Sequence, residues 1–120
     1  MERMNNDEKV KDCVDFHNQT KDLDEIINDI NRRDEITLRD TIELMTSEDY
    51  KKRFIAEYMQ TKIRYNNLHK MLIQLEAGTF IGFNPVSSIT VLNTQKAHMG
   101  NYLKQLEIRA EQEHIKLPNI

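Results

Sequence analysis

The sequence predicts an all-α protein: an antiparallel, coiled-coil-like helical hairpin preceded by shorter N-terminal helices. The first observation is a stripe with alternating steps of four and three residues: Phe54, Tyr58, Thr61, Tyr65, Leu68, Leu72 and Leu75. The second is a matching stripe near the C-terminus: Leu92, Gln95, Met99, Tyr102, Leu106 and Arg109. Such steps place residues on one face of a helix. Because only residues 78–88 separate the two stripes, the helices are expected to pack antiparallel.

The composition favours the same fold class. The 120 residues include three Gly and two Pro, with 38% hydrophobic and 31% charged residues, which is typical of helices with polar outer faces. Cys13 is the single cysteine, so no internal disulfide can form and a reducing compartment is expected. No apolar run reaches the length of a membrane span, and the N-terminus lacks the apolar core of a signal peptide. These features predict a cytoplasmic protein that does not enter a membrane.

Charge divides the chain into two predicted parts, an acidic helical extension over residues 1–45 and a hairpin domain over residues 46–120. The first part carries seven Lys/Arg against thirteen Asp/Glu, net −6, and the second ten against seven, net +3. The acidic part either lies over a basic surface or extends a basic module that binds anions. Ordinary variation among solvated helix faces is the remaining interpretation.

The extension is expected to hold two helical pieces and a short third helix. Thr20 is the expected N-cap between the first two pieces. Their apolar residues recur at spacings of three and four: Val10, Cys13, Val14 and Phe16, then Leu23, Ile26, Ile27 and Ile30. Thr37 is the expected N-cap of the short helix over residues 38–45, although its β-branched residues also allow an extended piece around 36–42.

The two hairpin helices have recognisable end signals. The first should begin at Thr46 or Ser47 and end at Gly78, because hydroxyl side chains cap helix starts and glycine ends helices. The second is expected to begin at Ser87 or Ser88 and to run to about residue 114. The connector between them, "GTFIGFNPVSS", contains three residues that are expected to be buried: Phe80, Ile81 and Phe83.

Pairing across the hairpin can be predicted because facing residues of antiparallel helices have numbers with a nearly constant sum. A sum near 164 pairs Tyr65 with Met99 and Tyr58 with Leu106. Each helix also has a second apolar set, which a lone hairpin cannot bury: Ile55, Met59 and Ile63, and Val91, Leu103 and Ile108. We therefore expect the N-terminal helices or another copy to cover these faces, and we expect a homo-oligomer.

The sequence lacks the usual signatures of catalysis and of cofactor binding. Four histidines, His17, His69, His98 and His114, show no metal-ligand spacing. No GxGxxG, Walker loop, nucleophile elbow or CxxC is present. We therefore expect a binding protein rather than an enzyme, with no catalytic residues, no metal and no cofactor.

A stripe of cations and aromatic rings on the long helix is the clearest sign of binding, since lysines contact phosphates and tyrosines stack on bases. Alternatively, its tyrosines are seam residues whose neighbouring lysines extend along the seam edge. If a neighbouring subunit completes an anion pocket at the open end of the hairpin, the candidate ligand-binding residues are Arg53, Tyr58, Lys62, Tyr65, His69, Tyr102 and Arg109. DNA or RNA is not an expected partner, because the chain is acidic overall and has no nucleic-acid-binding motif.

A longer residue pattern runs through residues 47–111. It reads Tyr-x-x-Arg-x-x-x-Glu, then Leu-x-x-Gln-x-x-x-Met-x-x-Tyr-x-x-x-Leu-x-x-Arg, at Tyr50, Arg53, Glu57, Leu92, Gln95, Met99, Tyr102, Leu106 and Arg109. This pattern resembles a family of small helical proteins of unknown function from tailed phages and prophages, labelled after crAss-like phages. The hairpin layout is also similar to that of small phage sponge proteins, which oligomerise and sequester cyclic nucleotides or related signals of bacterial antiviral systems.

The resemblance implies a bacteriophage counter-defence protein in the host bacterial cytosol. Its partners would be further copies of itself and a small nucleotide-derived signal, which it would sequester without catalysis. The alternative is a protein that inhibits a host defence factor through a protein interface, in which the acidic residues 1–45 imitate the charge of nucleic acid.

Overall fold

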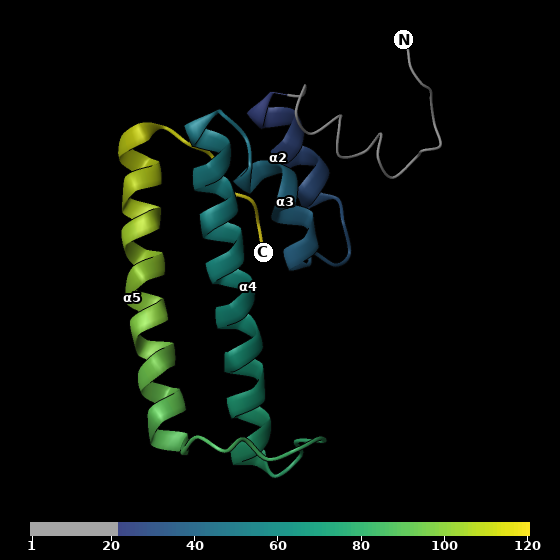
Figure 1. Cartoon of the computed structure of the whole chain (residues 1–120), viewed down its shortest axis with the longest axis vertical. Coiled ribbons are helices and arrows are strands. Elements are labelled where there is room, and N and C mark those ends of the chain that lie inside the picture. Colours follow the sequence, from purple (N-terminus) through teal and green to yellow (C-terminus); the bar gives the residue numbers. More distant parts are fainter. Residues whose placement is uncertain (1–21) are drawn as a thin grey trace.

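The computed structural model describes residues 22–120, and within that range the chain forms helices and no strand. The elements are α2 (Leu23–Asn31), the 3₁₀ helix η1 (Leu38–Thr41), α3 (Ile42–Met45), α4 (Tyr50–Ala77) and α5 (Ile89–Glu113). In Figure 1, α4 and α5 run antiparallel, and α2 and α3 lie on the other side of α4. The predicted all-α hairpin with shorter preceding helices is therefore confirmed, whereas the expectations for residues 1–21, including the Thr20 cap, lie outside the described residues.

Helix α2 begins at a capping box. The Asp22 carboxylate accepts a hydrogen bond from the Glu25 backbone N–H at 2.9 Å, and the Glu25 carboxylate accepts one from the Asp22 backbone N–H at 3.3 Å. These bonds satisfy N–H groups that have no partner inside the helix. The expected apolar spacing buries three residues on one face: Ile26, Ile27 and Ile30.

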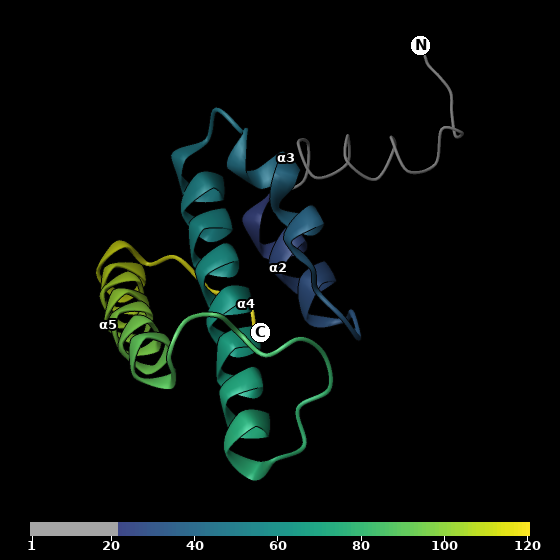
Figure 2. The same cartoon turned by 60° about the horizontal axis from the view of Figure 1, so that its bottom comes forward.

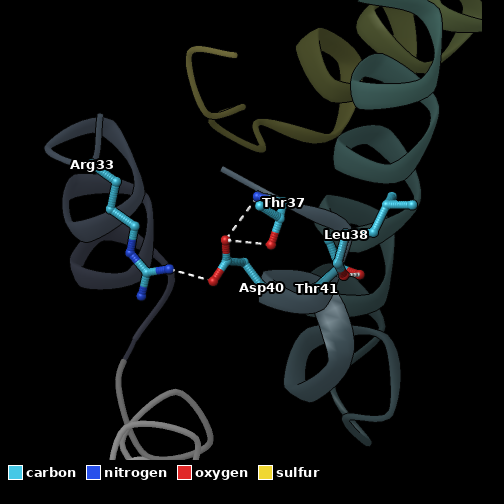
Figure 3. Close-up of polar contacts among 5 residues, drawn as sticks. All are labelled: Arg33, Thr37, Leu38, Asp40 and Thr41. Carbon is cyan, nitrogen blue, oxygen red and sulfur yellow. Dashed lines mark hydrogen bonds and ion pairs between the residues drawn. The ribbon is translucent and has the colours of Figure 1, made fainter. Parts of the chain in front are cut away.

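Asp40 fixes the turn that leads from α2 into η1 (Figure 3). One of its carboxylate oxygens accepts from the Thr37 backbone N–H at 2.8 Å and from the Thr37 hydroxyl at 3.3 Å. The other oxygen forms an ion pair with Arg33. Thr37 is thus the N-cap, as predicted, and the short helix expected over residues 38–45 consists of one 3₁₀ segment followed by one short α segment.

Thr41 joins this turn to α4. Its hydroxyl donates to the Leu38 carbonyl at 2.7 Å (both residues are drawn in Figure 3) and accepts from Gln60 Nε2 at 2.9 Å. Thr41 is 1% exposed, so its hydroxyl group is buried, and that hydroxyl forms both of these hydrogen bonds. A buried hydroxyl with these bonds avoids the desolvation cost of an unpaired one.

The ends of the hairpin helices follow most of the predicted signals. Helix α4 ends at Gly78 (φ 76°), and Ser88 begins α5 by accepting from the Val91 N–H at 3.1 Å. The predicted start of α4 at Thr46 or Ser47 was wrong. Asp49 caps this helix, because its carboxylate accepts from the Lys51 N–H at 2.9 Å. Ser47 instead accepts from the Asp49 N–H at 3.0 Å, so its hydroxyl stabilises the turn before the helix.

One hydrophobic core joins the N-terminal helices to the hairpin. It includes Ile27 from α2, Leu44 from α3, Met59 from α4 and Leu106 from α5, each at most 1% exposed. The segment after α5 closes this core with buried Ile115 and with the partly buried Leu117 and Ile120. The backbone N–H of Asn119 donates to Asn31 Oδ1 at 2.8 Å, which ties this segment to the end of α2.

The second apolar set of the hairpin is covered on α4 and largely open on α5. Ile55 and Met59 are fully buried in the core that α2 and α3 share. On α5, Val91 stays 56% exposed and Ile108 40% exposed. The predicted burial of the connector residues was wrong for two of the three. Phe80 is partly buried, but Ile81 and Phe83 are 92% and 96% exposed, because no described element packs over them.

Candidate anion-binding site

The contact between Tyr65 and Gly100 fixes how α4 meets α5 at the middle of the hairpin. A Cβ added at Gly100 would lie 3.5 Å from Cε1 of Tyr65. The residue numbers sum to 165, which agrees with the predicted pairing near 164. Because an α-helix turns about 100° per residue, Lys96, Gly100 and Glu107 share this edge of α5.

Two rings and two lysines gather at this edge. Lys62 Nζ of α4 lies 6.0 Å from the centroid of the Tyr65 ring, and Lys96 Nζ of α5 lies 5.9 Å from it. The His69 ring is parallel to that of Tyr65, with an interplanar angle of 1° and centroids 6.4 Å apart. His69 is exposed and the other three residues are partly buried. We call Lys62, Tyr65, His69 and Lys96 the Tyr65 cluster.

The Tyr65 cluster has the chemistry of a nucleotide site. Its lysines supply two positive charges, and ammonium groups bind phosphates. Its rings supply flat apolar surfaces on which a base can stack. Lys96 was missed from sequence because it lies between the positions of the heptad stripe, although the predicted pairing sum places it near Tyr65.

The arginines of the predicted site lie elsewhere and contact other protein groups. The Arg109 guanidinium carbon lies 4.6 Å from the centroid of the Phe54 ring, and its Nε donates to Glu113 at 3.2 Å. Arg53 donates to the Ser47 carbonyl at 2.8 Å, at the start of α4. The structure therefore does not bring Arg53 or Arg109 into the Tyr65 cluster.

The remaining two tyrosines of the predicted site also lie outside the cluster. Tyr58 is 5% exposed and belongs to the core. Burial, and secondarily the negative charge of Glu107, raise the pKa of Tyr58 above its ordinary value of 10.0. Tyr102 is 43% exposed and lies on the opposite edge of α5 from Lys96. Of the seven predicted residues, the structure thus brings together Lys62, Tyr65 and His69.

An open groove of about 570 Å³ runs along the outer face of α5. Its lining residues are Thr90, Val91, Thr94, Gln95, His98, Met99 and Tyr102. Gln95 and Tyr102 were expected on the seam with α4, but they are exposed and line this groove. Leu103 and Ala110 instead take buried positions on α5 beside Leu106, which rotates the seam away from the polar half of the predicted stripe.

A second hollow, of about 460 Å³, lies between the turn before η1 and α4. Its lining residues are Glu35, Ile36, Thr37, Leu38, Arg39, Ile63 and Asn67. Arg39 and Glu35 carry opposite charges, so an anion is attracted less strongly to this hollow than to the Tyr65 cluster.

Among residues 22–120, no group of three or more His, Cys, Asp or Glu residues is placed to hold a metal ion. In the same range, no helix is both long and apolar enough to cross a membrane.

Comparison with known proteins identifies the part of the chain that carries the cluster. A family model described as Sequestin matches residues 48–112. The chain belongs to the Sequestin family. The match covers α4, the connector and nearly all of α5, so the Sequestin hairpin contains every residue of the Tyr65 cluster. The family name suggests a sequestering role, whereas no curated protein and no solved structure matches the chain.

Proposed function

We propose that this Sequestin-family protein binds and sequesters a small anionic nucleotide-derived signal without catalysis. In this proposal it is a phage counter-defence protein that acts in the host bacterial cytosol. The observation that carries the proposal is the Tyr65 cluster, in which lysines from two helices flank one aromatic ring. The sequestering role that the family name suggests supports the same proposed function.

The geometry favours a ligand that combines phosphate with a flat ring. Lys62 and Lys96 are partly buried, so water screens their charge less than it screens a fully exposed lysine. The His69 ring, which is exposed and parallel to Tyr65, extends the aromatic surface outward. The net charge of +3 on residues 46–120 attracts anions to the hairpin.

Calorimetric titration tests this proposal directly. The ligands are cyclic dinucleotides, cyclic trinucleotides and ADP-ribose derivatives, and the proteins are the wild type, Lys62→Ala and Lys96→Ala. Each substitution should weaken binding by about 2 kcal/mol or more, as expected when a partly desolvated charge contact is lost. Lys116→Ala, which removes an exposed lysine outside the hairpin helices, is the matched control and should bind like the wild type.

Two results of this titration would contradict the proposal. If the wild type binds no member of the panel even at millimolar concentration, the proposed ligand class is wrong. If Arg109→Ala weakens binding while Lys62→Ala does not, the ligand binds away from the Tyr65 cluster, because Arg109 lies over Phe54 on the other edge.

The proposal also includes a homo-oligomer. The protein therefore has two kinds of partner, which are the signal and further copies of the chain. Its support is the exposed apolar surface on α5, where Ile89, Val91 and Ile108 are each at least 40% exposed. Sedimentation of the wild type at tens of micromolar tests this part of the proposal, and a strictly monomeric species would contradict it.

A second candidate function is inhibition of a host defence protein through the acidic N-terminal region. Residues 22–45 hold eight Asp/Glu against three Lys/Arg, net −5. They form α2, η1 and α3, on the side of α4 away from α5 (Figures 1 and 2). This layer therefore offers an acidic surface separate from the basic hairpin.

A further inference from the structure

The lysines of the Tyr65 cluster carry charges that no described residue neutralises. Lys62 Nζ and Lys96 Nζ lie 6.0 Å and 5.9 Å from the centroid of the Tyr65 ring. Within residues 22–120, neither ammonium group forms a hydrogen bond or an ion pair with another residue. Because both lysines are partly buried, water screens their charges incompletely, and an anion gains more by binding here than at a lysine that is already paired.

A tyrosine and a glutamate face each other on the same edge of the hairpin, one heptad further from the connector. The residue numbers of Tyr58 and Glu107 sum to 165, as those of Tyr65 and Gly100 do, and α4 and α5 run antiparallel (Figure 1). The charge of Glu107 also acts on the phenol: burial first, and Glu107 second, raise the pKa of Tyr58. Pairing and electrostatics therefore both place Glu107 beside Tyr58.

Neither of these two groups has a protein partner among the described residues. In that part of the chain, the Tyr58 hydroxyl and the Glu107 carboxylate form no hydrogen bond and no ion pair. Tyr58 is 5% exposed, and a buried hydroxyl without a partner carries a desolvation cost that a bound molecule can relieve. Glu107 is exposed, so a molecule from solution can reach its carboxylate.

The other edge of the hairpin shows what paired groups look like in this protein. There, Glu113 accepts from the Tyr50 hydroxyl and pairs with Arg109 Nε at 3.2 Å. The Arg109 guanidinium also lies over the Phe54 ring. Charges on that edge satisfy one another, whereas the edge of the Tyr65 cluster presents two cations, one carboxylate and one hydroxyl that remain available to a ligand.

We propose that Glu107, assisted by Tyr58, determines specificity by accepting a hydrogen bond from an uncharged donor of the nucleotide whose phosphate Lys62 and Lys96 bind. The donor is a ribose hydroxyl or the exocyclic amine of the base, since carboxylates in proteins accept hydrogen bonds from both. Tyr58 and Lys62 are four residues apart, about 6 Å along α4, so one nucleotide unit can contact both places. The inference rests on the proposed function and deepens it by naming a second part of the ligand.

The charge of Glu107 also fixes the direction in which the ligand lies. A phosphate placed beside this carboxylate is repelled, whereas the same phosphate beside the two lysines is attracted. The ligand therefore places its phosphate at the lysines and its uncharged donor at Glu107.

Calorimetric titration of three matched nucleotides into the full chain tests this specificity. The probes are AMP, 2′,3′-dideoxy-AMP, which lacks the ribose hydroxyls, and IMP, which lacks the exocyclic amine. The wild type should bind AMP about tenfold or more tightly than one of the two analogues, because a hydrogen bond to a charged group is lost. The analogue that loses affinity identifies the donor. Glu107→Ala should bind AMP as weakly as that analogue, so the preference disappears.

Three further variants separate specificity from phosphate binding. Tyr58→Phe should reduce the same preference, because it removes the hydroxyl beside Glu107. Lys62→Ala should weaken binding of all three probes alike, because each of them has a phosphate. Glu111→Ala is the matched control, since it removes an exposed carboxylate one turn further along α5 and should keep the preference for AMP. Glu107 is itself exposed, so its substitution should leave the fold intact.

The outcomes distinguish this inference from the proposed function. If the wild type binds the three probes equally, or if Glu107→Ala keeps the preference for AMP, Glu107 does not determine specificity, although the proposed function stands. If the wild type binds cyclic dinucleotides or ADP-ribose derivatives but none of the three mononucleotides, one nucleotide unit does not span the two places and the inference is wrong. If it binds no nucleotide at millimolar concentration, the proposed function and this inference are both wrong.

Discussion

At the scale of single residues, Tyr65 determines both the helix pairing and the candidate site. Its ring lies against Gly100 on one side and within 6.0 Å of two lysine ammonium groups. The heptad stripe could predict that Tyr65 faces α5, because burial follows helical periodicity. It could not predict Lys96, since a cation at the edge of a seam has no periodic signal of its own.

Gly100→Ala should stabilise the protein by about 1 kcal/mol, which is the cost of glycine against alanine inside a helix. The added methyl group meets Tyr65 Cε1 at 3.5 Å, an ordinary van der Waals distance, so no side chain has to move. Urea denaturation at a fixed protein concentration measures the effect. A loss of stability would mean that Tyr65 packs more tightly on α5 than the structure shows.

Tyr58 should make stability fall with pH above about pH 10, where its ordinary pKa lies. Burial first, and Glu107 second, raise the pKa of Tyr58 in the folded state. Below its unfolded pKa, the phenol is neutral in both states and contributes no pH dependence. As the pH rises through the interval between the two pKa values, the unfolded state loses the proton first and unfolding becomes easier.

Tyr58→Phe removes this titration, so its unfolding free energy should fall less steeply than that of the wild type above about pH 10. Urea denaturation at several pH values compares the two slopes. Equal slopes for the two proteins would show that Tyr58 has the same pKa in the folded and unfolded states.

At the scale of elements, local capping chemistry predicted most helix ends. Thr37, Gly78 and Ser88 have the expected roles because each acts through hydrogen bonds or dihedral angles within a few residues. The prediction failed where two acceptors compete: Ser47 and Asp49 lie two residues apart, and Asp49 caps the helix. The exposure of Ile81 and Phe83 was also missed, because burial depends on elements distant in sequence.

The segment after α5 should contribute measurably to stability. Ile115 is 6% exposed within the core, so Ile115→Ala should lower the unfolding free energy by about 2 to 5 kcal/mol, the range for removing a large aliphatic side chain from a core. The neighbouring Lys116 is exposed, and Lys116→Ala should leave stability nearly unchanged. Thermal unfolding of the two variants checks the difference, and equal melting temperatures would contradict the placement of Ile115 in the core.

At the scale of the whole molecule, the layers separate the charges. The charge counts alone predicted an acidic N-terminal part and a basic hairpin, and in the described residues the acidic layer of α2, η1 and α3 lies beside α4 on the side away from α5. Residues 22–45 nevertheless share the hairpin's core through Ile26, Ile27 and Leu44. Deleting residues 1–45 would therefore remove core side chains, so it cannot separate the two candidate functions.

Neutralising exposed carboxylates of the acidic layer separates the two functions without removing core residues. The triple variant Asp24→Asn, Glu35→Gln and Asp34→Asn changes three exposed side chains and none of the Tyr65 cluster. If the protein acts by sequestering an anionic signal, this variant should retain wild-type ligand affinity in calorimetry and wild-type counter-defence activity in infected cells. Reduced negative charge also repels an anion less, so affinity should rise slightly at low salt and return to the wild-type value at high salt.

The opposite result would favour the second function. A protein that imitates nucleic acid depends on its carboxylates, so the triple variant would lose counter-defence activity while Lys62→Ala and Lys96→Ala would keep it. Thermal unfolding must first show that the triple variant is folded, and exposed substitutions of this kind usually change stability by less than about 0.5 kcal/mol each. Since the carboxylates and the lysines lie in different layers of the molecule, the two sets of variants report on two surfaces independently.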